Sequence, residues 1–149
     1  MKPPNEDLEN RVPVWEALGE FFLDNEPQLE CVVRICAESP YSLQELDQIL
    51  FSEVWPALSP NLASVAGEWA GWNREWLSQR ILEKHKTGTS SLWWLHPAKL
   101  FFCSDWFRVR QDIENRRFQK AQARAMQHAR ASQPAPSTMP RTNASPAHI

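Results

Sequence analysis

Apolar residues recur at steps of three and four along most of this chain, and that spacing is the period of an α-helix. The clearest stripe consists of Leu62, Val65, Trp69, Trp72 and Trp76. No segment shows a convincing strict alternation of apolar and polar residues, the pattern of a half-buried strand. The length of 149 residues suits one ordinary domain. The sequence therefore predicts an all-α fold, with the tryptophans of this stripe in the core together with Trp15 and Trp106.

Start and stop residues divide the chain into separate helices. Pro13 suits a first helical turn, and Ser42 with Glu45 forms a capping box, in which each side chain can satisfy a backbone amide of the other residue. Pro56 is expected to end the helix that follows the capping box. Asn73 either interrupts a long helix or caps a separate one. These signals predict a compact bundle of five or six helices with a basic C-terminal helix.

The composition changes along the chain and predicts four segments. We expect a flexible arm over 1–10, a helical domain over 11–115, a basic helix extension over 116–131 and a disordered tail over 132–149, which is rich in Pro, Ser and Ala. No apolar run approaches the roughly 18 residues of a membrane span, and the first residues lack the pattern of a signal peptide. We therefore expect a cytoplasmic protein.

The formal net charge of −2 hides two halves of opposite sign. Residues 1–70 carry three positive and thirteen acidic side chains, a net charge of −10, whereas residues 71–149 carry thirteen positive and five acidic ones, a net charge of +8. Such halves either neutralise each other or face different partners. We favour mutual neutralisation within one domain.

No motif in the sequence carries a known catalytic chemistry. A Gly-rich phosphate loop and a His-Glu-x-x-His zinc pattern are both absent from the sequence. Cys31 and Cys36 lie about 140° apart around a helix, which is poor geometry for a shared zinc ion. We expect no catalytic residue, no metal site and no cofactor.

Glu68 is the one carboxylate with unusual neighbours, because Gly67, Trp69, Gly71 and Trp72 surround it in the sequence. A carboxylate in such a setting is either a structural group that fixes helix packing or a catalytic one. We favour the structural role, because no partner for catalysis is visible.

Three tryptophans do not fit the helical stripes. Trp93 and Trp94 are adjacent, so one face of a helix or strand cannot easily bury both, and Trp55 stands just before a proline at a helix end. Burial in the core and use at an interface are equally favoured for these rings. The interaction candidates are therefore Trp55, Glu68, Trp93 and Trp94.

The basic helix over 108–130 holds seven Arg or Lys residues against two acidic ones. Binding to phosphates requires clustered positive charge. The candidates for nucleic-acid contacts are Arg116, Arg117, Lys120 and Arg124. An exposed, solvated helix is the favoured alternative, because no helix-turn-helix pattern accompanies the charge.

Three stretches occur together in a specific order: Ala37-Glu-Ser-Pro-Tyr-Ser-Leu43, Ile49-Leu-Phe-Ser-Glu-Val54 and Pro60-Asn-Leu-Ala-Ser-Val-Ala-Gly-Glu-Trp-Ala-Gly-Trp72. With them the chain resembles a family of small bacterial proteins classed as a domain of unknown function, over about Arg11 to Ile81. The resemblance implies no catalytic residues, and it leaves the basic helix and the tail outside the shared part.

Three functional hypotheses follow from these observations. The first is a non-catalytic protein-interaction module, for example an immunity or antitoxin-like protein that binds a partner protein with its acidic surface. The alternative is a nucleic-acid-associated accessory protein that uses the helix over 108–130. The weakest is a small enzyme centred on Glu68. The oligomeric state is left open.

Overall fold

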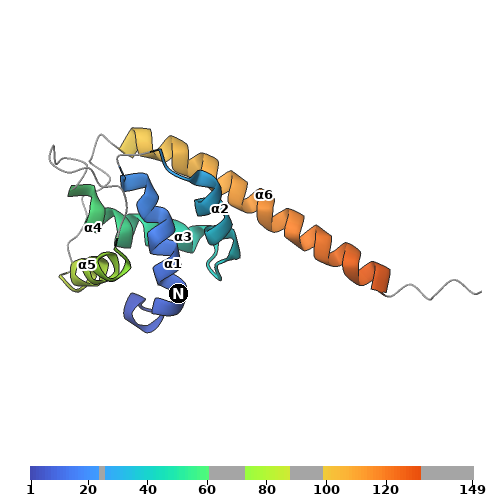
Figure 1. Ribbon diagram of the computed structural model, residues 1–149, viewed down its shortest axis with the longest axis horizontal. Helices are drawn as coiled ribbons and strands as arrows, with labels where there is room; N and C mark the ends of the chain where they lie inside the picture. The colour runs from blue at the N-terminus through green and yellow to red at the C-terminus, as the bar shows by residue number, and fades with distance from the viewer. Residues whose placement is uncertain (24–25, 61–72, 88–98, 132–149) are drawn as a thin grey trace, which may run out of the picture.

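The computed structural model describes residues 1–23, 26–60, 73–87 and 99–131, with side chains in the last range from residue 104 onward. All regular structure in these ranges is helical, which confirms the predicted all-α fold. The helices are η1 (Pro4–Glu6), α1 (Leu8–Gly19), η2 (Glu20–Phe22), α2 (Leu29–Glu38), α3 (Leu43–Ile49), η3 (Leu50–Val54), α4 (Trp55–Leu58), α5 (Arg74–Lys86) and α6 (Lys99–Ala131) (Figure 1). The predicted tail over 132–149 lies outside the described residues.

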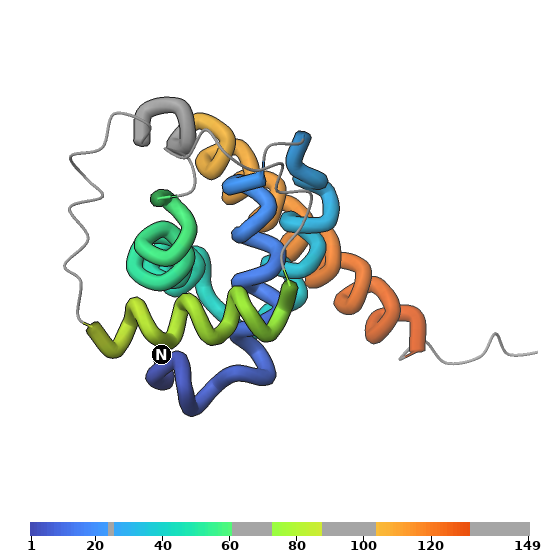
Figure 2. Tube along the Cα trace, turned by 60° about the vertical axis from the view of Figure 1, so that its left-hand side comes forward, coloured from blue at the N-terminus to red at the C-terminus, as the bar shows by residue number. Residues whose placement is uncertain are grey.

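Helix α1 is the central element of the body. It packs against α2, α5 and η3, and α2 in turn packs against α6. In Figure 2, α5 crosses in front of α1 while α6 runs behind it. The C-terminal part of α6 projects beyond all other helices (Figure 1). Helix α1 therefore lies between α5 and the α2–α6 pair.

The apolar stripes of several helices meet in one core, as their spacing predicts. The buried members of these stripes are Val32, Val33 and Cys36 in α2, Leu46, Leu50 and Val54 in α3 and η3, and Trp106, Val109 and Ile113 in α6. Trp15 is also buried, but the prediction for Trp76 is wrong, because 39% of its surface is exposed. Trp76 belongs to the first turn of α5, where the outer face of the helix meets solvent.

Helix α1 begins five residues before the expected start at Pro13, so residues 8–10 of the predicted arm are helical. Pro13 lies inside the helix, where its missing N–H leaves the carbonyl of Glu9 without the usual helical bond. The neighbouring side chains of Arg11 and Val14 are buried in the body. Their packing holds a helical turn that local sequence alone disfavours.

The prediction that Pro56 ends its helix is also wrong. The segment η3 is a π-helix, in which the Trp55 N–H donates to the carbonyl of Leu50, five residues earlier. Pro56 follows directly in the first turn of α4, so the helical path continues past the proline. The continued helix turns both Glu53 and Trp55 into the core, where they are 4% and 3% exposed.

Two of the predicted helix caps are confirmed. The Ser42 hydroxyl accepts from the Glu45 amide at 3.2 Å, and the Ser42 amide donates to the Glu45 carboxylate at 2.8 Å. That backbone bond is the main reason why the pKa of Glu45 lies below its usual value. The Asn73 side chain accepts from the amide of Trp76 at 2.9 Å. Asn73 therefore caps a separate helix, α5.

The two oppositely charged halves of the chain contact each other. Three ion pairs each join an acidic residue of the first half to an arginine of the second: Glu16–Arg74 at 2.7 Å, Glu30–Arg116 at 2.7 Å and Asp47–Arg110 at 3.1 Å. The Asp47 carboxylate also accepts from the indole N–H of Trp106 at 2.8 Å. The favoured interpretation, neutralisation within one domain, agrees with these pairs.

Candidate functional site

The most deeply buried polar group is an ion pair between Arg11 and Glu53, which are 0% and 4% exposed. One carboxylate oxygen of Glu53 accepts from Arg11 Nη1, and the other accepts from the indole N–H of Trp15 at 2.8 Å. Burial alone would lower the pKa of Arg11, but the Glu53 carboxylate raises it above its usual value. Both oxygens of Glu53 are occupied, so this carboxylate is positioned to hold the fold together rather than to move protons.

This pair is not among the residues predicted above, although the sequence carries one signal for it. Arg11 stands four residues before Trp15, on the helical face that Leu18 and Phe22 continue. A charge on a core-facing stripe requires a buried partner, because burying an unpaired charge is costly. Glu53 itself gives no comparable signal, because it follows several other acidic residues.

The N-terminal residues form a strap over this pair. Arg11 Nη2 donates to the carbonyl of Lys2 at 2.9 Å, and the guanidinium lies 5.1 Å from the centre of the Tyr41 ring. The Tyr41 hydroxyl donates to Asp7 at 2.6 Å, and this bond is the main reason why the pKa of Asp7 is lowered. An open pocket of about 400 Å³ lies beside the strap, and its lining includes Arg11, Glu53 and His85. The strap therefore covers the charged pair rather than extending freely.

Two of the four basic candidates on α6 face the body. Arg117 donates to three main-chain carbonyls at the end of α2 and the turn after it: Cys36 at 2.8 Å, Ala37 at 3.2 Å and Tyr41 at 2.7 Å. Arg116 pairs with Glu30. The expectation that these two arginines face a nucleic acid is therefore corrected. Both join α6 to α2: Arg117 because helix ends leave carbonyls that need donors, and Arg116 through its pair with the exposed Glu30 side chain.

Beyond Arg117 no described part of the body buries the helix. We define residues 118–131 as the α6 overhang, a stretch about 21 Å long at 1.5 Å per residue. Every residue in it is exposed, including Phe118 at 63% and Met126 at 64%. Figure 1 shows it extending away from the other helices. Its charged residues are all positive (Lys120, Arg124 and Arg130), and no acidic residue occurs over 115–131.

The α6 overhang has an apolar face with a positive charge on either side. With about 100° of rotation per residue, Phe118, Ala125 and Ala129 point in directions within about 40° of one another. Arg124 and Arg130 lie about 120° from Phe118, on opposite sides. Long arginine side chains at such positions can reach past the apolar face to a partner's rim. This arrangement resembles that of helices that dock into grooves.

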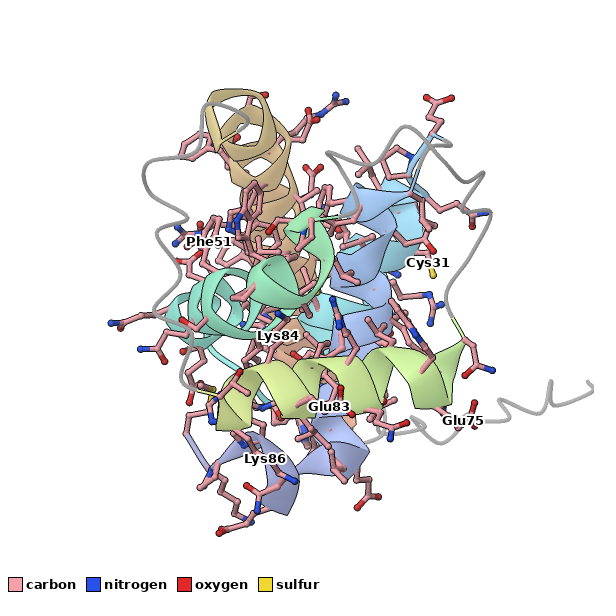
Figure 3. The ribbon with its side chains drawn as sticks, turned by 90° about the vertical axis from the view of Figure 1, so that its left-hand side faces the viewer. Cys31, Phe51, Glu75, Glu83, Lys84 and Lys86 are labelled. Carbon is pink, nitrogen blue, oxygen red and sulfur yellow. The ribbon has the colours of Figure 1, made fainter. Side chains whose placement is uncertain are left out.

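A second surface feature is an open groove between α1 and α5, which we name the α1–α5 groove. It has a volume of about 510 Å³, and its lining consists of Leu8, Glu9, Val12, Pro13, Arg74, Glu75, Ser78 and Leu82. Arg74 donates two hydrogen bonds to Glu16, at 2.8 and 2.7 Å, so its charge is compensated. The groove therefore has an apolar lining and one exposed carboxylate on each wall, Glu9 from α1 and Glu75 from α5. Glu75, labelled in Figure 3, also interacts with the charge of Arg74.

The structure places one of the four interaction candidates. Trp55 packs edge-on against Phe22, with 5.5 Å between ring centres, and lies in the core. Its use at an interface is thus corrected, because the π-helix turns the ring inward. Glu68, Trp93 and Trp94 lie outside the described residues.

The described cysteines are free thiols in different surroundings. Cys36 is fully buried, and burial raises the pKa of its thiol to about 12. Cys31 is half-buried, and its sulfur accepts from Arg34 at 3.5 Å. Across the described ranges, no three His, Cys, Asp or Glu residues are grouped so that they could hold a metal ion.

Among the described helices, none combines the length and the apolar character needed to cross a bilayer. Helix α6 is long enough, but it is rich in charged and polar residues.

Comparisons with known proteins give one match. Neither the curated proteins nor the solved structures contain a match to the chain. A family model, by contrast, matches residues 9–119, which is more of the chain than the Arg11–Ile81 stretch expected from the sequence motifs. Arg116 and Arg117 fall within the matched residues, whereas Lys120 and Arg124 fall beyond them. The chain belongs to the family DUF7079, a domain of unknown function.

Proposed function

We propose that this chain is a non-catalytic protein-interaction module of the bacterial cytoplasm, and that it binds its partner through the α6 overhang. The observation that carries the proposal is the exposure of this helix: Phe118 and Met126, both on the overhang, are more than 60% exposed. Large exposed apolar side chains on a projecting helix are typical of docking elements. The immunity or antitoxin-like role expected from the sequence is one case of this proposal.

The acidic surface, which the sequence suggested as the contact, supports the proposal less well. Glu16, Glu30 and Asp47 are engaged by arginines of the second half. The buried Glu53 is held by Arg11 and Trp15, so the described carboxylate with the most buried setting has no free oxygen for acid–base work. Both observations favour binding through the overhang over catalysis.

Photo-crosslinking in the native host tests this proposal. A photoreactive phenylalanine analogue replaces Phe118 in one variant and Phe107 in a matched control, because Phe107 is equally exposed, at 62%, on the part of α6 that the body supports. We expect one discrete protein adduct from position 118 and none from position 107. Identical adduct patterns at both positions, or no adduct at 118, would refute a role for the overhang.

The nucleic-acid alternative is favoured by a separate observation. Lys120, Arg124 and Arg130 lie on an exposed helix with no ion pair among the described residues. Three phosphate contacts predict that the logarithm of the DNA association constant falls with the logarithm of salt with a slope of about −2.7. Fluorescence anisotropy on a random duplex measures this slope, and Lys120→Gln with Arg124→Gln should reduce it. Binding that is absent at low salt, or unchanged in that variant, excludes the alternative.

A further inference from the structure

The α6 overhang and the α1–α5 groove lie at opposite ends of one molecule. In Figure 1, α5 is on one side of the body and the overhang extends away on the other. Helix α1 packs against both α2 and α5 and thus stands between them. An overhang therefore cannot reach the groove of its own chain, and any overhang seated in this groove belongs to another molecule.

The two surfaces are complementary in shape and chemistry. The groove offers an apolar floor that includes Leu8, Val12 and Leu82, and its volume of about 510 Å³ can receive an aromatic anchor. The overhang offers Phe118 as that anchor. An apolar ring that enters a closely fitting pocket is the usual centre of a binding interface.

The charges match in position as well as in sign. Glu9 lies on the α1 wall of the groove and Glu75 on the α5 wall, and both are exposed. Arg124 and Arg130 lie on opposite flanks of the apolar face of the overhang, about 120° from Phe118. A helix seated with Phe118 on the floor can therefore direct one arginine toward each wall. Complementary charges of this kind orient a helix and exclude wrong partners.

Pairing of two overhangs with each other is disfavoured by the same charges. Each carries Lys120, Arg124 and Arg130, and neither has a carboxylate over 115–131. Bringing two such helices side by side sets like charges against each other. The acidic rim of the groove is thus the better partner for an overhang.

We propose that the α6 overhang of one copy docks into the α1–α5 groove of a second copy, so that the chain associates head to tail. This inference rests on the proposed function and names the partner as a second copy of the chain. Because the two surfaces differ, each contact leaves one groove and one overhang open. The assembly therefore grows with concentration or closes into a ring, rather than stopping at a symmetric dimer.

Sedimentation velocity on the full chain over a concentration series tests the proposal. The average mass of the wild type is expected to rise with concentration and to fall again in high salt, because the charged rim is screened. Phe118→Ala should weaken self-association at least about tenfold, since it removes the anchor. Glu9→Lys with Glu75→Lys should have a similar effect, whereas the matched control Phe107→Ala should not.

A mixing experiment separates head-to-tail docking from any symmetric contact. The Phe118→Ala chain keeps its groove, and the Glu9→Lys, Glu75→Lys chain keeps its overhang. An equimolar mixture is therefore expected to form a 1:1 dimer that does not grow further, although each variant alone stays monomeric. Far-UV circular dichroism checks that both variants are folded, and all three replaced residues are exposed.

Three results would overturn the inference. They are a wild type that is monomeric throughout the series, self-association that persists unchanged in Phe118→Ala, and a mixture that stays monomeric. If the crosslinker at position 118 joins the chain to a different protein, none of these three results contradicts the proposed function. A crosslink from 118 to the α1–α5 groove of a second copy would support both.

Discussion

Replacing Glu53 by Gln removes the negative charge at the centre of the core and keeps the size of the side chain. The new amide oxygen can still accept from the indole N–H of Trp15, which lies 2.8 Å from the present carboxylate. Arg11 is 0% exposed and keeps its charge, because a guanidinium does not lose its proton in proteins. The substitution therefore leaves a buried positive charge without its counter-charge.

The expected cost follows from that unpaired charge. Removing one partner of a buried ion pair destabilises proteins by about 3–5 kcal/mol. Arg11 also donates to the Lys2 carbonyl and lies over the Tyr41 ring, and both contacts persist in the variant. We therefore expect the free energy of unfolding to fall by about 3 kcal/mol. This is a large part of the roughly 5–15 kcal/mol that stabilises an ordinary domain. Adding Arg11→Met removes the stranded charge, so the double variant should recover at least about 1 kcal/mol relative to Glu53→Gln.

Urea unfolding followed by far-UV circular dichroism measures these free energies, provided that the slopes against urea agree among the variants. Glu30→Gln is the matched control, because it breaks the 2.7 Å pair with Arg116 at a site where the glutamate side chain is 82% exposed. An exposed pair is worth less than about 1 kcal/mol. A loss below about 1 kcal/mol for Glu53→Gln, or a double variant less stable than that single variant, would refute the reasoning.

Three further predictions follow from other contacts. In a Cys103→Ser background, a thiol reagent at pH 8 should modify Cys31 well before Cys36, because burial raises the pKa of Cys36 to about 12. Equal rates of modification would contradict the burial of Cys36. Arg117→Ala should cost about 1–3 kcal/mol in urea unfolding, since three carbonyls lose a donor, whereas Arg124→Ala on the overhang should stay within about 0.5 kcal/mol. The hydrogen bond from the Tyr41 hydroxyl lowers the pKa of Asp7. The stability that this bond contributes is therefore fully present above the ordinary Asp pKa of about 3.9, and it is lost as the pH falls through the lowered pKa. The melting temperature of Tyr41→Phe should therefore fall less steeply with decreasing acidic pH than that of the wild type. An equally steep fall in both proteins would exclude this contact as its source.

The sequence by itself determined the fold class, the core positions of Trp15 and Trp106 and two helix caps. Each of these depends on residues three to four positions apart, and a helix brings such residues together whatever surrounds it. The capping box of Ser42 and Glu45 and the cap at Asn73 are examples, since both are closed within one turn. The charge asymmetry was equally visible, and the structure resolved it into three ion pairs between the halves.

Only the tertiary structure decided which polar groups are buried and which surfaces are open. Arg11 and Glu53 are 42 residues apart, and the three carbonyls that Arg117 caps lie 76 to 81 residues before it. Contacts over such separations depend on how the helices pack, so no local sequence pattern indicates them. The same packing is accompanied by a π-helix just before Pro56, continues the helix past this proline in α4 and turns Trp55 inward. It also left the last turns of α6 exposed, with no described part of the body burying them, whereas Arg116 and Arg117 are engaged by α2.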